Sequence, residues 1–133
     1  MDTSRLVGWF RTRYGFLRGV GIDIIEDGCG STNYNDGTKS ITMFLCSLKS
    51  AHRSGFYRGR LGDVAFRDLV VLVLLHEIRH VWQWQKKGRE YMTKRVSSVR
   101  MAMDHDSHPL ERAADLFAKR EYARIKDKIK LYF

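Results

Sequence analysis

The sequence contains few cysteines, and this scarcity limits the kinds of scaffold that it can form. Only two are present among 133 residues, Cys29 and Cys46. Two cysteines are too few for a disulfide-stapled scaffold, and their spacing matches no common zinc-binding knuckle. If the strands that flank residues 29–37 form a hairpin, these cysteines lie roughly 30 Å apart, which is well beyond the reach of a disulfide. We therefore predict two unpaired, buried thiols in a reducing compartment.

Long apolar stretches and linkers are also absent. The longest unbroken apolar run, Leu69 to Leu75, has seven residues, whereas a membrane-spanning helix needs about 20. The N-terminal residues form no apolar run of the kind found in signal peptides. No repeat, low-complexity tract or linker rich in proline or glycine divides the chain, which holds a single proline. We expect one domain over residues 1–133, in an intracellular, cytoplasmic protein without a membrane partner.

Acidic residues are scarce relative to basic ones. The chain has 15 Asp and Glu against 24 Lys and Arg, so its formal net charge is +9. Such a charge favours anionic partners, although a solvated basic surface has the same composition. The basic stretch Lys86–Arg100 is a candidate contact for a phosphate backbone. Nucleic acid is therefore a candidate partner.

Two short segments have the pattern of β-strands. Apolar side chains alternate in Val20–Ile25 and again in Ile41–Leu45, as expected for half-buried strands. Between them, the residues Asn35–Gly37 form a strong turn signal. We predict that the two strands pair as an antiparallel hairpin. The following segment, Ser47–Gly62, is rich in glycine and arginine and predicts a loop.

Helical periodicity marks three further segments. Apolar residues recur at helical spacing over Leu6–Tyr14, which predicts an N-terminal helix that ends near Gly15. Asp63–Gly88 is apolar nearly all round in its first half, which predicts a buried central helix. Pro109 suits the first position of a C-terminal helix, and residues 89–107 favour a short helix or a lid. Together these elements predict an α+β fold with a small antiparallel sheet.

The central helix carries a metal-binding pattern. His76 and His80 are four residues apart, so on a helix both imidazoles lie on one face and can chelate one divalent ion. Glu77 follows His76 and lies beside such an ion, where a carboxylate can take a proton from an activated water. The residues His-Glu-Ile-Arg-His have the spacing of the HExxH signature of zinc metallopeptidases.

A catalytic zinc site requires a third protein ligand. The downstream candidates are His105, His108 and Glu111. Glu111 is favoured, because it begins the C-terminal helix and Asp115 lies four residues later on the same face. In this arrangement Asp115 accepts a hydrogen bond from the free ring N–H of a ligand histidine and fixes its tautomer. A structural alternative is that Glu111 complements the dipole of the first helical turn.

These two motifs together resemble those of the gluzincin metallopeptidases, a family with an HExxH helix and a later helix that carries Glu and, four residues on, Asp. The chain is most similar to the small, stand-alone minigluzincins, which include phage and mobile-element proteins. The resemblance implies a zincin-like fold in which Zn²⁺ is held by His76, His80 and Glu111, with Glu77 as general base and Asp115 as the partner of a ligand histidine.

The resemblance also implies a mode of substrate binding. Gluzincins use a strand before the active-site helix as a sheet edge that pairs with an extended substrate, a sound way to capture a peptide. The corresponding residues here are Ile41, Thr42, Met43, Phe44 and Leu45. In zincins of the SprT type a downstream histidine is the third ligand, so His105 or His108 would then replace Glu111.

We therefore expect a zinc metallopeptidase that hydrolyses a protein or peptide substrate through an activated water. The intermediate of that reaction needs a further hydrogen-bond donor, and the candidates are Tyr91, His105, His108 and Arg112. The competing hypothesis is a nucleic-acid-associated, zincin-like protein whose zinc site is structural or latent. The net charge motivates that alternative.

Overall fold

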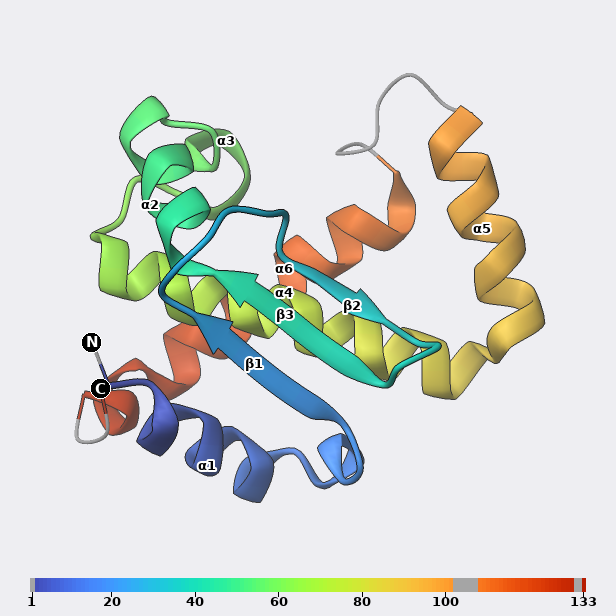
Figure 1. The fold of residues 1–133 in the computed structure, drawn as a ribbon, viewed down its shortest axis with the longest axis horizontal. Coiled ribbons are helices and arrows are strands. Elements are labelled where there is room, and N and C mark those ends of the chain that lie inside the picture. Colours follow the sequence, from blue (N-terminus) through green and yellow to red (C-terminus); the bar gives the residue numbers. More distant parts are fainter. Residues whose placement is uncertain (1, 102–107, 131–132) are drawn as a thin grey trace.

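The computed structural model describes residues 2–101, 108–130 and 133, and over this part of the chain the architecture is α+β (Figure 1). The strands are β1 (Gly21–Ile25), β2 (Asn33–Asn35) and β3 (Ser40–Phe44). The helices are α1 (Ser4–Arg13), α2 (Leu45–Ser54), α3 (Arg58–Leu61), α4 (Phe66–Lys87), α5 (Arg89–Met101) and α6 (Pro109–Ile129), and a short 3-10 helix, η1, spans Gly15–Leu17.

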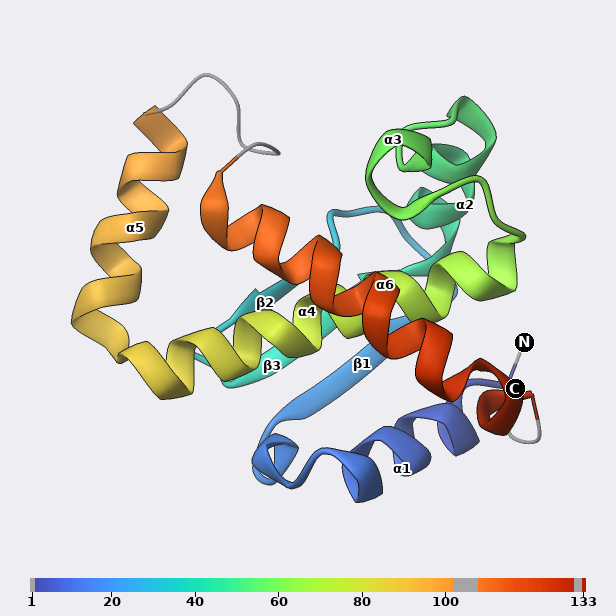
Figure 2. The same cartoon turned by 180° about the vertical axis from the view of Figure 1, so that it is seen from behind.

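The sheet, α4 and α6 form three successive layers, with α4 in the middle (Figures 1 and 2). Every residue of α4 from Leu69 to Ile78 is buried, so these turns have no side that faces solvent. This confirms the prediction of a buried central helix. Gly88 ends α4 with φ of 88°, in the region that favours glycine.

The predicted strand pairing is wrong. β1 pairs with β3 in parallel, whereas β2 pairs with β3 in antiparallel fashion, so the strand order is β1-β3-β2. The turn signal at Asn35–Gly37 does form a hairpin turn, where Asn35 Oδ1 accepts hydrogen bonds from the backbone of Gly37 and Thr38. That turn joins β3 to β2 rather than to β1. The additional strand reverses the chain once more, and the two apolar strands consequently run in the same direction.

The segment Ser47–Gly62, predicted to be a loop, contains helices instead. Leu45, expected at the end of a strand, begins α2, and α3 follows after Gly55, which has φ of 77°. Both helices are anchored by leucines that are buried in the core, Leu48 and Leu61. These few apolar anchors are too widely spaced to produce a clear helical pattern in the sequence.

Both cysteines are unpaired, but the prediction that they are buried is wrong. Cys29 and Cys46 are exposed. Cys29 precedes β2, in a segment that has few apolar residues. Cys46 is the second residue of α2 and lies on the side of that helix away from Leu48.

The terminal helices agree with the prediction. α1 ends at Arg13, and α6 begins at Pro109 with His108 as its N-cap. Tyr14 connects the two ends of the chain, since its hydroxyl donates to Glu121 of α6 over 2.5 Å. Within residues 2–101, 108–130 and 133, no helix has the length and apolar character needed to cross a membrane.

Candidate metal centre

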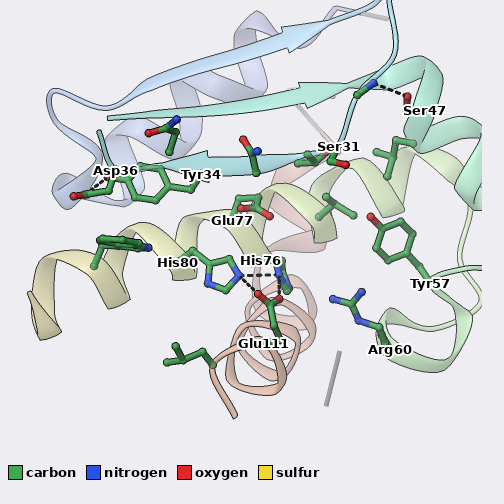
Figure 3. A pocket seen from close by; sticks show the side chains of 18 of the residues that line it. Ser31, Tyr34, Asp36, Ser47, Tyr57, Arg60, His76, Glu77, His80 and Glu111 are labelled. Atoms are coloured by element: carbon green, nitrogen blue, oxygen red, sulfur yellow. Dashed lines mark hydrogen bonds and ion pairs between the residues drawn. The ribbon is translucent and has the colours of Figure 1, made fainter. Parts of the chain in front are cut away.

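Two histidines from consecutive turns of α4 form the base of the site. The ring atoms Nε2 of His76 and Nε2 of His80 are 3.0 Å apart, and the rings are nearly perpendicular, at 84°. Their spacing of four residues places both on the side of α4 that faces α6, as Figure 3 shows. This is the relationship that the HExxH pattern predicts.

Glu111, in the first turn of α6, completes the group. Its Oε2 lies 2.9 Å from Nε2 of His76, and its Oε1 lies 3.1 Å from Nε2 of His80. The ligand atoms of the three residues all lie within 4.8 Å of one another. Two imidazole nitrogens and one carboxylate, converging from two helices, can hold a divalent metal ion.

The other nitrogen of each histidine ring has its own acceptor. Nδ1 of His76 donates to Asp115 Oδ1 over 2.8 Å, and Nδ1 of His80 donates to Gln83 Oε1 over 2.8 Å. The amide of Gln83 is oriented by its Nε2, which donates to the backbone carbonyl of Leu110. In the neutral imidazoles both protons then reside on Nδ1, so the Nε2 lone pairs are directed at the space beside Glu111. This chemistry fits a bound cation.

Arg60 of α3 extends this network. Its Nε donates to Asp115 Oδ2 over 2.9 Å and its Nη2 donates to Asp115 Oδ1 over 3.1 Å. The two-point contact fixes the plane of the carboxylate that receives the His76 proton. A chain of contacts therefore leads from α3 through α6 to the face of α4 that carries His76 and His80.

The charges in the site depend strongly on one another. Burial lowers the pKa of His76, but hydrogen bonds to Asp115 and Glu111 outweigh it and raise that pKa to about 9. The pKa of His80 is also raised: burial lowers it, but the hydrogen bond to Glu111 and the negative charges of Glu77 and Glu111 together outweigh burial. Burial raises the pKa of Glu111, yet both histidines together hold it well below its ordinary value. The site therefore concentrates compensating charges, which is typical of a functional centre.

Glu77 points from α4 toward β2 (Figure 3) and lines the same cavity as His76, His80 and Glu111. Burial raises the pKa of its carboxyl group, while the two histidines and the backbone N–H of Tyr34, which donates to the carboxylate, act in the opposite direction. The net result is a raised pKa. A buried carboxyl group whose pKa is raised is a candidate for general acid–base chemistry.

All four residues line one cavity of about 910 Å³. Its walls come from β2 and the residues before it, from α2 and α3, from α4, and from the first turns of α5 and α6. No residue of Ile41–Phe44 lines it. The expectation that this strand is a free sheet edge is wrong, because β3 has a neighbour on both sides. Within the described residues, the edge that faces the cavity is β2.

Three of the four candidate donors for the reaction lie outside the cavity. Tyr91 is exposed, and its ring stacks against Lys87 and Arg95 of its own helix. Nδ1 of His108 accepts a hydrogen bond from the backbone of Leu110 and so caps α6. Arg112 is exposed on the outer side of α6. None of these three lines the cavity, and His105 lies outside the described residues.

Sequence reasoning missed three contributors to the site. The role of Gln83 could have been predicted, because it follows His80 by three residues and lies on the same face of the helix. The role of Arg60 could not have been predicted, since its partner Asp115 is 55 positions away in the sequence. Tyr34 contributes through its backbone N–H, which a pattern of side chains cannot predict.

In comparisons with known proteins, the chain matched no protein-family model, no curated protein and no solved structure.

Proposed function

We propose that this protein is a zinc-dependent peptidase with a zincin-like fold that hydrolyses peptide bonds in a protein or peptide substrate. One observation carries the proposal: the buried carboxyl group of Glu77 shares a cavity with a convergent group of His76, His80 and Glu111. Two imidazoles and one carboxylate form a ligand set that suits zinc. The motif resemblance described above supports the same identity.

The three ligands would hold the ion and leave room beside it for a substrate. Zinc supplies Lewis acidity, which polarises a peptide carbonyl. The contribution of the protein is to keep the ligands fixed before substrate arrives. Asp115 and Gln83 do this by fixing the proton of each histidine on Nδ1, and the large cavity admits an extended chain.

Glu77 would act as the general base and then as the general acid. Its carboxylate removes a proton from the attacking water as the oxygen approaches the peptide carbonyl. The same proton then passes to the nitrogen of the leaving amine. The raised pKa of Glu77 supports both steps, because it makes this carboxylate a stronger base toward the water proton than an ordinary carboxylate is.

The edge of β2 is the proposed docking strand. The backbone N–H of Tyr34 points away from β3 and toward Glu77. An extended peptide that pairs with this edge would lie along the cavity, with its backbone close to the metal ligands. Main-chain pairing gives affinity without much sequence selectivity, so side-chain pockets would determine the preferred sequence.

A Glu77→Gln variant tests the proposal. The amide keeps the shape of the side chain but cannot accept the water proton, so we expect cleavage of unfolded protein substrates to fall by at least about two orders of magnitude. Zinc content, measured on the purified protein, should remain unchanged. The matched control is Glu90→Gln on α5, whose carboxylate is exposed and 3.6 Å from Lys94.

Two results would contradict the proposal in different ways. Undiminished cleavage by Glu77→Gln would remove the proposed base. A wild-type protein that binds zinc at unit stoichiometry but cleaves nothing would have a structural or latent metal site, as in the competing hypothesis.

A further inference from the structure

The acidic residues of α6 are unevenly distributed around the helix. Glu111 lies against His76, Asp115 lies against Arg60, and Glu121 is buried beside Tyr14. All three therefore face inward and are already bound to protein groups. The remaining acid of the helix, Asp127, is exposed.

The basic residues of α6 face outward. Arg112, Lys119 and Lys126 of the helix and Lys130 at its C-cap are exposed and follow one another at intervals of seven, seven and four residues. At about 1.5 Å of rise per residue, they form a nearly straight row along the helix. We call this row and its immediate neighbours the outer face of α6, which comprises Arg112, Leu116, Lys119, Arg120, Ala123, Lys126, Asp127 and Lys130.

The cations of the outer face are not neutralised within the protein. Arg112, Lys119, Arg120, Lys126 and Lys130 form no ion pair with any residue that the structure describes. Five cations against one acid on a single helical face are a strong local concentration of positive charge. Such a surface attracts a polyanion, and a bound polyanion reduces the repulsion among its cations.

We propose that the outer face of α6 binds the phosphate backbone of double-stranded nucleic acid. Cations seven residues apart are separated by roughly 10 Å along the helix, which corresponds to about three nucleotides of axial rise on one strand. The polar side chains of the face are five lysines and arginines and one aspartate, and the face carries no asparagine or glutamine for contacts to base edges. Binding is therefore independent of base sequence.

A lipid surface fits this face less well. A helix that binds membranes buries an apolar face among the acyl chains, but the apolar side of α6 is already packed in the core through Ala118, Ile125 and Ile129. On the outer face the only large apolar side chain is Leu116, which is 44% exposed. The same shortage of apolar area argues against an acidic protein partner, since protein interfaces usually have an apolar centre.

The outer face and the metal centre can be occupied together. Helix α6 covers α4 on the side opposite the sheet (Figure 2), and the cations of the outer face are exposed. Glu111, in contrast, points from α6 toward α4 and the cavity (Figure 3). The inference is independent of the proposed peptidase activity. If both hold, the protein can cleave a polypeptide while it is bound to nucleic acid.

The test compares two triple variants that change the formal charge equally. In the first, Lys119→Glu, Arg120→Glu and Lys126→Glu reverse the outer face. In the control, Arg18→Glu, Lys49→Glu and Arg53→Glu reverse exposed cations after η1 and on α2. Binding of a fluorescent, random-sequence DNA duplex is measured by anisotropy across a salt series. Glu77→Gln serves as a further control, because its duplex affinity should equal that of the wild type.

We expect wild-type affinity to fall by about two to three orders of magnitude between about 50 and 200 mM salt. The outer-face variant should bind at least about tenfold more weakly at low salt and show a salt slope reduced by about three, while the control variant changes much less. If the Glu variant does not fold, the same three residues are changed to Gln instead. We expect that variant to lose duplex affinity to a similar extent, because the three cations are still removed, although Gln adds no repulsion of the phosphates.

Three results would overturn the inference. The wild type could fail to bind duplex, or both charge-reversal variants could lose affinity equally, which would mean that only net charge matters. Tighter binding to vesicles of an anionic phospholipid than to duplex, lost in the outer-face variant, would assign the surface to lipid.

Discussion

Gln83 Oε1 lies 2.8 Å from Nδ1 of His80, and the Nε2 of the same amide donates to the backbone carbonyl of Leu110 over 3.1 Å. One buried side chain thus links a metal-ligand candidate on α4 to the first turn of α6, the turn that contributes Glu111. The position of His80 and the approach of Glu111 are therefore coupled through a single residue.

We expect Gln83→Ala to weaken zinc binding by roughly 10- to 100-fold, the usual effect of removing a partner of a ligand histidine. The His80 ring would lose the acceptor that fixes its proton on Nδ1. Competition with a chromophoric chelator measures the affinity. Gln85→Ala is the matched control, because Gln85 lies two residues later, is exposed, and bonds to the carbonyl of Phe16. Equal affinities in the two variants would contradict the role given to Gln83.

Arg60 should also affect zinc binding, although it is not a ligand. Arg60→Ala removes both hydrogen bonds that orient Asp115, and we expect zinc affinity to fall about tenfold. Arg60→Lys should restore only part of it, because an ammonium group cannot make the two-point contact.

The control for Arg60 lies on the same short helix. Arg58 is exposed, and its Nε is 3.6 Å from an exposed carboxylate, Asp63. Arg58→Ala should leave zinc affinity unchanged, since exposed ion pairs contribute little. If Arg60→Ala, Arg60→Lys and Arg58→Ala all bind zinc like the wild type, Asp115 does not need the guanidinium group to hold His76.

The sequence predicted the parts of the site that depend on local geometry. His76, Glu77 and His80 lie within one and a half turns of a helix, so their relative positions follow from helical spacing alone. Glu111 and Asp115 were also readable, because they occupy one face at the start of a helix that Pro109 marks. The contact between these two helices depends on tertiary packing, and it was expected only because a catalytic zinc site requires a third ligand and because the two motifs resemble those of gluzincins.

The sequence did not predict the features that depend on long-range pairing. Asn33–Asn35 lacks the alternating apolar pattern of a strand and is extended because it pairs with β3; β-strand formation is strongly context-dependent. Missing this strand led to the wrong partner for Ile41–Phe44 and to the wrong substrate edge. Arg60 was missed for the same kind of reason, since its position depends on how α3 packs near α6.

Substitutions of Glu111 and His108 should have opposite effects on zinc binding, because only Glu111 is proposed as the third ligand. Glu111→Ala removes the carboxylate that lies near both imidazoles, so zinc stoichiometry after dialysis should fall well below that of the wild type. His108→Ala removes only the N-cap of α6, which lowers the free energy of unfolding by about 1 kcal/mol and leaves zinc bound. Loss of zinc in His108→Ala with retention in Glu111→Ala would exchange their roles.

Glu121 should make the stability of the fold depend on pH. Burial raises the pKa of this carboxyl group, but hydrogen bonds from Tyr14 and Arg13 outweigh it, so the pKa is lower in the folded protein than its ordinary value of 4.5. A lowered folded-state pKa stabilises the protein at pH values above the unfolded-state pKa, and this stability is lost as the pH falls through the folded-state pKa.

Glu121→Gln removes the charge that both donors need. We expect the free energy of unfolding at pH 7, measured with urea, to fall by about 1 to 3 kcal/mol. The difference from the wild type should shrink as the pH falls below about 4.5, because Glu121 then gains a proton first in the unfolded protein and, at lower pH, in the folded protein as well. Glu90→Gln, at an exposed position on α5, should leave stability nearly unchanged throughout. A constant difference between wild type and Glu121→Gln from pH 7 to pH 3 would show that shape, rather than charge, ties α1 to α6.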